Sequence, residues 1–204
     1  MQYMQQQRLR TEDKAERERQ RAEREAAMRD RNNRLGLNLF QGSWIMAFVS
    51  LVVVNWQLGF SAEWVAEGAQ LPDTTVPTIA TILLFISTFL ARSAKQAIEN
   101  DRRDDYMWQW PLAIALGAAF FGIMLTQFYA VEPGDGQFVF VYRLMIGYHA
   151  VHAVVIGLMM AQVYRYALQG RYDSSNFWPI EATTKLWYFV TIAWVLFYVV
   201  LYVI

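Results

Sequence analysis

The sequence predicts an all-α polytopic membrane protein, in which five transmembrane helices form a bundle and a charged cytoplasmic helix precedes them. Apolar residues make up 55% of the 204-residue chain and aromatic residues 16%. The charged residues are concentrated at particular places and leave long uncharged runs between them. Buried helices of a soluble protein need polar faces that these runs lack, so the membrane class is favoured.

Five uncharged runs are long enough, or nearly so, to cross a bilayer. They comprise 28 residues between Arg34 and Glu63, 18 between Asp73 and Arg92, 26 between Asp105 and Glu132, 21 between Arg143 and Arg165, and the last 19. A helix needs about 20 apolar residues to span the hydrocarbon core. The second run can be extended because Arg92 and Lys95 can reach the headgroups. We therefore expect one domain, 37–204, with spans at about 39–60, 76–98, 110–131, 138–166 and 183–204.

The segment 1–36 is expected to form a charged cytoplasmic arm that is largely helical. Ten of the 18 Lys and Arg residues lie between Arg8 and Arg34, together with seven of the 18 acidic residues. Pairs such as Asp13/Arg17 and Arg21/Glu25 have the i,i+4 spacing that stabilises a helix by a few tenths of a kcal/mol. No heptad seam is present, so a coiled coil is not predicted. The arm is either a solvated helix or a strut on a partner's cytoplasmic surface.

The basic residues alternate from one side of the predicted bundle to the other. The arm is rich in Arg, whereas all charged residues of the connection 61–75 are acidic. The connection after the second span carries Arg92, Lys95, Arg102 and Arg103. Because Lys and Arg concentrate on the cytoplasmic side, the N-terminus is predicted to be inside and the C-terminus outside. The net charge is zero, so no nucleic-acid partner is expected.

Proline and small residues add detail to the predicted spans. Pro77, Pro111 and Pro179 are expected near helix starts, where a missing N–H costs little. Span three carries the pairs Ala113/Gly117 and Ala118/Gly122 at four-residue spacing, and span four carries Ala150, Ala153 and Gly157 on one face. Small residues let helices approach closely in lipid, so these positions indicate either close approach of both spans to other helices or, as we favour, ordinary packing within the bundle.

Two histidines lie at membrane depth, where ionisable side chains are costly and often functional. His149 and His152 are three residues apart on span four, so they cannot bind one haem iron from opposite faces. A zinc or copper site needs a third ligand, and the chain has no cysteine. We therefore expect both imidazoles to form hydrogen bonds with neighbouring helices, and we expect no metal site.

Two charged residues lie near span ends. Arg143 can reach the headgroups or pair with Glu132 or Asp135. Glu181 precedes Lys185 by four residues, which predicts a local ion pair. No nucleotide-binding, nucleophile or cofactor motif is present, so no catalytic residue is assigned.

From Gly42 onward, the chain resembles subunit III of the haem-copper terminal oxidases, cytochrome c or quinol oxidases, in its five-helix form. The matching segments are Gly42-Ser-Trp44 in span one, Thr81-Ile-Leu-Leu-Phe-Ile-Ser87 in span two, Gln127 in span three, Gly147-Tyr-His149-Ala-Val-His152 in span four, and Glu181-Ala-Thr-Thr-Lys-Leu-Trp187 through Trp194 in span five. These segments occur in the family's order over about 160 residues.

The chain departs from this family pattern at several polar positions. Ser50 stands where the family has a membrane-embedded glutamate, which is linked to proton uptake by the catalytic subunit. Ala130 replaces an acid, and Tyr188 and Thr191 replace a histidine and an aspartate of span five. The proton-related role of the glutamate therefore does not carry over to this chain.

The resemblance implies a non-catalytic subunit of a respiratory oxidase in the inner (plasma) membrane of a prokaryote. Haem and copper are expected in the partner subunits I and II, and bound phospholipid is expected in this one. Arg143, His149 and His152 would hold span four to its neighbours, while Glu181, Trp187 and Trp194 would fix span five.

Three other functions remain open from the sequence. A subunit-III-like accessory protein of nitric oxide reductase, or of another respiratory complex, fits the neutral substitutions. A b-type cytochrome would use His149 with a ligand from another chain. A small transporter fits less well, because the spans are continuous and no inverted repeat is visible.

Overall fold

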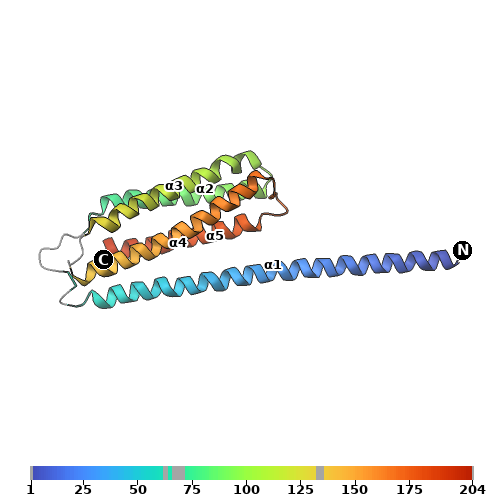
Figure 1. The fold of residues 1–204 in the computed structure, drawn as a ribbon, viewed down its shortest axis with the longest axis horizontal. Coiled ribbons are helices and arrows are strands. Elements are labelled where there is room, and N and C mark those ends of the chain that lie inside the picture. Colours follow the sequence, from blue (N-terminus) through green and yellow to red (C-terminus); the bar gives the residue numbers. More distant parts are fainter. Residues whose placement is uncertain (1, 62–63, 66–71, 132–135, 204) are drawn as a thin grey trace. The chain divides into compact units, whose positions relative to one another are not determined.

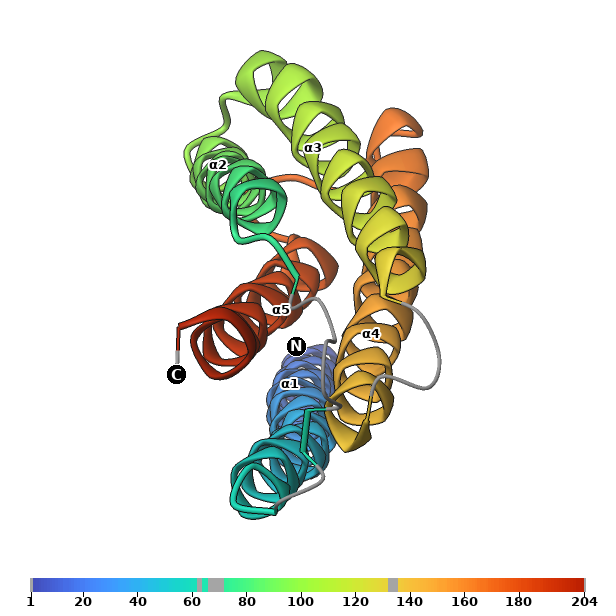
Figure 2. The same cartoon turned by 90° about the vertical axis from the view of Figure 1, so that its left-hand side faces the viewer.

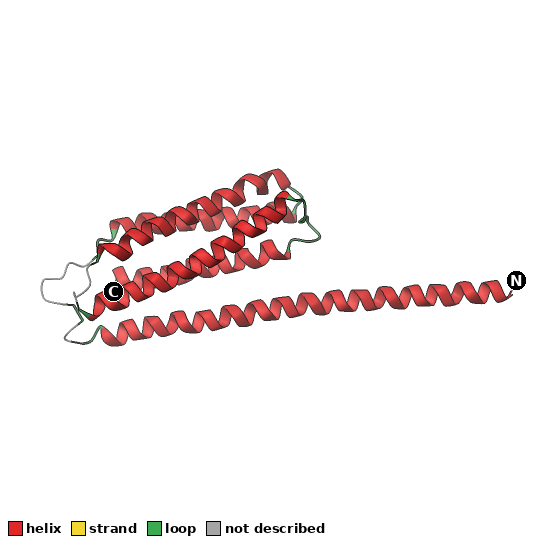
Figure 3. Ribbon diagram, in the orientation of Figure 1, coloured by secondary structure: helices red, strands yellow, loops and turns green. Residues whose placement is uncertain are grey.

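The structure, a computed structural model, describes residues 2–61, 64–65, 72–131 and 136–203, and the regular elements in these ranges are helices (Figure 3). They are α1 (Gln2–Leu58), α2 (Thr75–Glu99), α3 (Arg103–Ala130), α4 (Gln137–Leu168) and α5 (Trp178–Tyr202), labelled in Figure 1. All five are long and apolar enough to cross a membrane. The predicted all-α class is confirmed, and each predicted span overlaps a different helix.

The chain divides into two compact units, Met1–Trp44 and Ile45–Ile204. The first consists of the beginning of α1, which runs on without a break because no proline occurs before Pro72. On its exposed surface Lys14 pairs with Glu18 at 3.9 Å and Asp30 with Arg34 at 2.9 Å. The boundary near residue 36 and the pairs Asp13/Arg17 and Arg21/Glu25 stay predictions.

In the second unit, four helices form a closed ring in which α2 adjoins α3 and α5, and α4 adjoins the same two helices (Figure 2). The part of α1 that belongs to this unit reaches the ring through Phe48, which is only 2% exposed. The Phe48 ring centre lies 4.9 Å from that of Tyr148 on α4 and 5.0 Å from that of Phe197 on α5. One aromatic side chain therefore fills the space between α4 and α5.

Large apolar side chains cover the outside of the unit as well as its interior. Phe89, Val151, Leu158 and Ile192 are between 62% and 70% exposed. An apolar exterior of this kind is unfavourable in water and suits hydrocarbon. The interior contains the bulky rings of Tyr106, Trp110, Trp187 and Trp194.

The three membrane prolines do not occupy equivalent positions. Pro77 lies in the first turn of α2 and Pro179 lies at the start of α5, as predicted. The prediction for Pro111 was wrong, because α3 begins at Arg103 and places this proline inside the helix. Pro111 has no N–H for the carbonyl of Met107, four residues earlier, and the Tyr164 hydroxyl of α4 donates to that carbonyl instead, at 3.2 Å. Polar contact with α4 therefore compensates for the proline.

In the opposite direction, two side chains of α3 donate to carbonyls of α4. The indole Nε1 of Trp110 donates to the carbonyl oxygen of Met160 at 3.0 Å, and Nη2 of Arg103 donates to that of Ala167 at 2.7 Å. Ala167 belongs to the last turn of α4, and its carbonyl also accepts from the Gly170 N–H at 3.0 Å. Carbonyls at this end of a helix carry partial negative charge and attract a cation.

The glycines of α3 and α4 differ in what surrounds them. A Cβ at Gly117 would lie 2.5 Å from Cζ2 and 2.8 Å from Cη2 of Trp187, so only glycine leaves room for this ring. Among the described residues, nothing lies within 4 Å of a Cβ placed at Gly122 or at Gly157. The predicted close packing is therefore confirmed at Gly117, whereas the other two glycines face no side chain of this unit.

Gly117→Ala is expected to destabilise the bundle, because the new methyl group collides with a buried indole that cannot move without breaking its own contacts. Overpacking of this kind costs about 1–3 kcal/mol. Gly122→Ala, in the same helix, makes the same chemical change in open space and should leave stability unchanged or slightly raised. Thermal unfolding of the two purified variants in detergent measures the difference. Equal midpoints would contradict the assignment of Gly117 as the close-contact site.

Candidate functional site

The most extensive polar arrangement in the second unit joins α2, α3 and α5 at Trp187. The indole N–H of Trp187 donates to the Ser87 hydroxyl at 3.0 Å, and that hydroxyl donates to the carbonyl of Ala113 at 2.7 Å. Ser87 and Trp187 are buried, with 0% and 2% exposure. Three helices are therefore connected through one serine oxygen.

The second tryptophan of α5 forms a similar contact with α2. The Trp194 indole N–H donates to the Thr81 hydroxyl at 2.8 Å. This hydroxyl donates to the carbonyl of Pro77 at 2.7 Å, one turn earlier in its own helix. Each hydroxyl thus accepts from an indole and donates to a backbone carbonyl, which satisfies both groups in a region without water.

Two hydroxyl pairs complete this contact between α2 and α5. Thr88 and Thr191 lie 2.6 Å apart, and Thr78 and the Tyr198 hydroxyl also lie 2.6 Å apart. We call the four contacts the α2–α5 ladder: Thr78–Tyr198, Thr81–Trp194, Ser87–Trp187 and Thr88–Thr191. Polar contacts of this kind hold helices together in lipid, where apolar surface alone gives no preference for protein over lipid.

The ladder brings together residues that the sequence placed in separate segments. Thr81 and Ser87 mark the ends of the matching segment in span two, and Trp187 and Trp194 belong to the one in span five. The predicted role of the two tryptophans in fixing span five stays a prediction, but each has a named partner on α2. Thr191, a departure from the family pattern, still forms a cross-helix bond through its hydroxyl.

His149 lies among aromatic rings. Its ring centre is 5.4 Å from that of Trp194, 5.8 Å from that of Phe120 and 6.0 Å from that of Phe48. The side chain is 1% exposed, and neither ring nitrogen has a hydrogen-bond partner in the described part of the chain. The prediction that His149 bonds to neighbouring helices was therefore wrong, and ring packing takes the place of hydrogen bonds.

His152 faces a different environment on the same helix. Its Nδ1 lies 2.7 Å from the carbonyl oxygen of Tyr148, so Nδ1 carries the proton in this contact. The Tyr148 and Phe48 rings lie 4.3 Å and 5.1 Å from the imidazole. Over the ranges that the structure describes, no three His, Asp or Glu side chains are placed so that they could share a metal ion.

Arg143 fastens the start of α4 to the end of α3. Its Nη2 donates to the carbonyl of Val131, the residue that caps α3, and its guanidinium lies 5.5 Å from the ring centre of Phe128. A cation beside the C-terminal end of a helix is favourable because the carbonyls there carry partial negative charge. The alternative partners Glu132 and Asp135 lie outside the described residues.

Glu181 has a charged partner, whereas Ser50 bonds only to a backbone carbonyl of its own helix among the described contacts. The Glu181 carboxylate pairs with Lys185 at 2.9 Å in the first turns of α5, which confirms the predicted local ion pair. Ser50 is exposed on α1, and its hydroxyl donates to the carbonyl of Met46 at 2.9 Å. A serine hydroxyl that donates to its own helix does not ionise, so it cannot replace the acidic group of the family pattern at this position.

Three residues of the aromatic cluster and the α2–α5 ladder were not predicted from the sequence, namely Phe48, Thr88 and Thr191. Phe48 gave no signal beyond its apolar character, although it touches both histidines. Thr88 and Thr191 were not paired, because a threonine on a membrane helix can equally well bond to its own preceding turn. The distance of 103 residues between them left no local pattern to detect.

Residues 18–204 match the family model described as cytochrome c oxidase subunit III. The match includes most of α1 and all of α2 to α5. It therefore covers every apolar segment that was predicted to cross the membrane.

Several curated proteins with this description are similar to the chain. Cytochrome c oxidase subunit 3 of Thermostichus vulcanus is 28% identical over 174 residues, covering 83% of this chain and 86% of the relative. That of Bacillus sp. (strain PS3) is 26% identical over 190 residues, covering 88% and 89%. That of Petromyzon marinus is 23% identical over 129 residues, and the chain spans about half of its length, 49%.

Ser87→Ala is expected to weaken the bundle, because the buried Trp187 N–H loses its acceptor and the Ala113 carbonyl loses the bond from the serine. The loss should be about 1–2 kcal/mol, within the range measured for polar contacts between membrane helices and for unpaired buried groups. Thr126→Ala serves as the control, since this exposed hydroxyl bonds only to Ile123 of its own helix. Thermal unfolding in detergent should show a lower midpoint for Ser87→Ala alone. A Trp187→Phe background that leaves the effect of Ser87→Ala unchanged would contradict the pairing.

Proposed function

The chain belongs to the cytochrome c oxidase subunit III family, and we propose that it acts as a non-catalytic subunit III of a haem-copper terminal oxidase in aerobic respiratory electron transport. In this role it packs beside the catalytic subunit I, together with subunit II, and supports its assembly and stability. The single observation that carries the proposal is the family match over residues 18–204, which includes most of α1 and all of α2 to α5.

The geometry of the second unit supports a structural role. Several of its polar side chains at membrane depth form contacts between helices, as the α2–α5 ladder and the Arg143 contact with the end of α3 illustrate. His149 is enclosed by rings and does not present a nitrogen to solvent. We therefore propose that haem and copper are held by the partner subunits and that this chain holds phospholipid at its membrane-facing surface.

We propose an orientation from the distribution of basic residues. The ends of α2 and α4 and the start of α5 carry Arg92, Lys95, Arg165 and Lys185. Basic residues favour the cytoplasmic side, so this end of the bundle is assigned to the cytoplasm of a prokaryote and the C-terminus to the outside.

A second candidate is an accessory subunit of nitric oxide reductase or of another respiratory complex. Ser50, Tyr188 and Thr191 favour it, because neutral side chains stand where the oxidase pattern has ionisable ones. A partner that does not depend on these groups for proton uptake would tolerate the substitutions.

Purification of the tagged full-length chain from its native membrane in a mild detergent tests the proposal. Subunits I and II of a haem-copper oxidase should co-purify in equal amounts and be identified by mass spectrometry. Recovery of nitric oxide reductase subunits would support the second candidate. Recovery of no respiratory subunit under conditions that preserve other membrane complexes would refute both.

His149→Ala distinguishes a supporting subunit from a b-type cytochrome. If haem is bound only by the partners, the variant complex should keep the Soret absorbance per subunit I of the wild type, although the lost ring packing lowers its thermal stability. His152→Ala, one turn along the same helix, serves as the matched comparison. A Soret band that disappears only in His149→Ala would assign a haem to this chain.

A further inference from the structure

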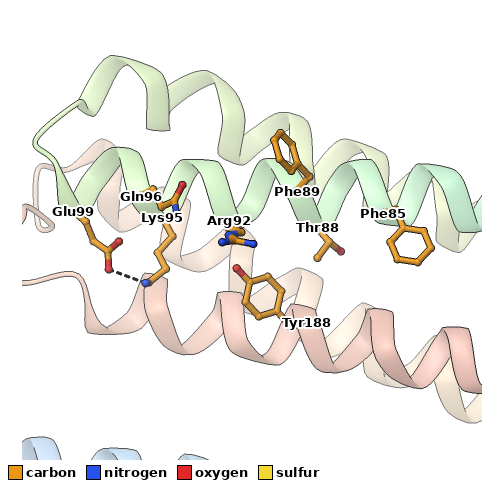
Figure 4. A pocket seen from close by; sticks show the side chains of 8 residues that line it. All are labelled: Phe85, Thr88, Phe89, Arg92, Lys95, Gln96, Glu99 and Tyr188. Atoms are coloured by element: carbon orange, nitrogen blue, oxygen red, sulfur yellow. Dashed lines mark ion pairs between the residues drawn. The ribbon is translucent and has the colours of Figure 1, made fainter.

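An open hollow of about 620 Å³ lies between the second half of α2 and the start of α5 (Figure 4). Its apolar part contains Phe85 and Phe89, and its polar part contains Arg92, Lys95, Glu99 and, from α5, Tyr188. The α2 residues follow one another at intervals of three or four positions, so they form a single face of the helix. This face changes from aromatic to charged along its length.

The change of character falls where a membrane surface is expected. Arg92 lies 17 residues after Thr75, the first residue of α2. At about 1.5 Å per residue this is about 26 Å along the helix, close to the thickness of the hydrocarbon core, which is about 30 Å. The aromatic part of the hollow is therefore at the depth of acyl chains, and the charged part is at the depth of headgroups.

The charges of the hollow leave one cation uncompensated. Lys95 forms an ion pair with Glu99 at 2.7 Å, and both side chains are partly exposed. In the part of the chain that the structure describes, no carboxylate forms an ion pair with Arg92. Arg92, Lys95 and Glu99 together therefore leave a single positive charge, on a guanidinium whose planar donors suit a phosphate group.

Tyr188 adds a neutral donor on the opposite wall. Figure 4 shows its hydroxyl directed from α5 toward the Arg92 side chain on α2. An anion between the two helices can then accept hydrogen bonds from both walls. A phosphodiester can use donors from two sides, because the two non-bridging oxygens that share its negative charge point in different directions.

We propose that this hollow binds an anionic phospholipid of the adjoining leaflet. Its phosphodiester lies between Arg92 and Tyr188, and an acyl chain runs along Phe85 and Phe89. The site rests on the proposed function only in naming where this subunit holds lipid. A phospholipid with one net negative charge neutralises the hollow, whereas a zwitterionic one leaves the positive charge in place.

Native mass spectrometry of the purified full-length chain tests this site. The chain is mixed in detergent with equal amounts of phosphatidylglycerol and phosphatidylcholine, and the one-lipid adducts of each are compared. Wild type should prefer phosphatidylglycerol by about tenfold, and Arg92→Gln should abolish that preference, since one charge-assisted contact accounts for a factor of this order. Arg165→Gln is the matched control, because Arg165 is an exposed arginine in the last turn of α4, at the same end of the unit and outside the hollow.

Tyr188→Phe keeps the ring and removes only the hydroxyl, so it tests the site without disturbing the packing of α5. It should lower the phosphatidylglycerol adduct by about two- to fivefold, less than Arg92→Gln does, since a neutral hydrogen bond is weaker than a charge-assisted one. Equal adducts of both lipids on wild type, or an unchanged preference in Arg92→Gln, would overturn the proposal. The isolated chain carries this test, so its outcome is independent of whether oxidase subunits co-purify.

Discussion

Hydrocarbon supplies no hydrogen-bond partners, and the second unit is organised around this constraint. Indoles and hydroxyls between α2 and α5 must find their partners within the protein, and the four contacts of the α2–α5 ladder provide such partners. The same requirement explains why Tyr164 reaches the carbonyl that Pro111 leaves open. Polar contacts thus decide which helices are neighbours, while apolar side chains face both inward and outward.

Shape complementarity depends on the same contacts. Trp187 can donate to Ser87 only because Gly117 leaves space for the far edge of its ring. Trp194 bonds to Thr81 on one side and packs against His149 and Phe120 on the other. The imidazole of His149 is consequently a member of an aromatic cluster that includes Phe48 of α1. Ring contacts therefore connect Phe48 of α1 to the ladder, from Phe48 to His149 and from His149 to Trp194.

Much of the fold could be predicted because membrane thickness acts on the sequence locally. Uncharged runs gave the five spans, and two of the three prolines marked helix starts as expected. Pro111 could not be placed correctly, since its cost is offset by Tyr164, 53 positions further along the chain. The membrane depth of His149 was predictable from its place within an uncharged run, but its surroundings were not, because they are formed by three other helices. The pair Glu181–Lys185 was predictable because it involves a single helical turn.

The position of α5 in the chain has a consequence for how the protein is made. The partners of Thr81 and Ser87 lie about a hundred residues further on, in the last helix of the five. During synthesis α2 enters the membrane before the two indole donors exist, and the contacts with Trp187 and Trp194 can form only once α5 has been inserted. Insertion of α5 is then the step that closes the ring of four helices. A chain interrupted before that step would keep the open face of α2 accessible to membrane quality-control factors.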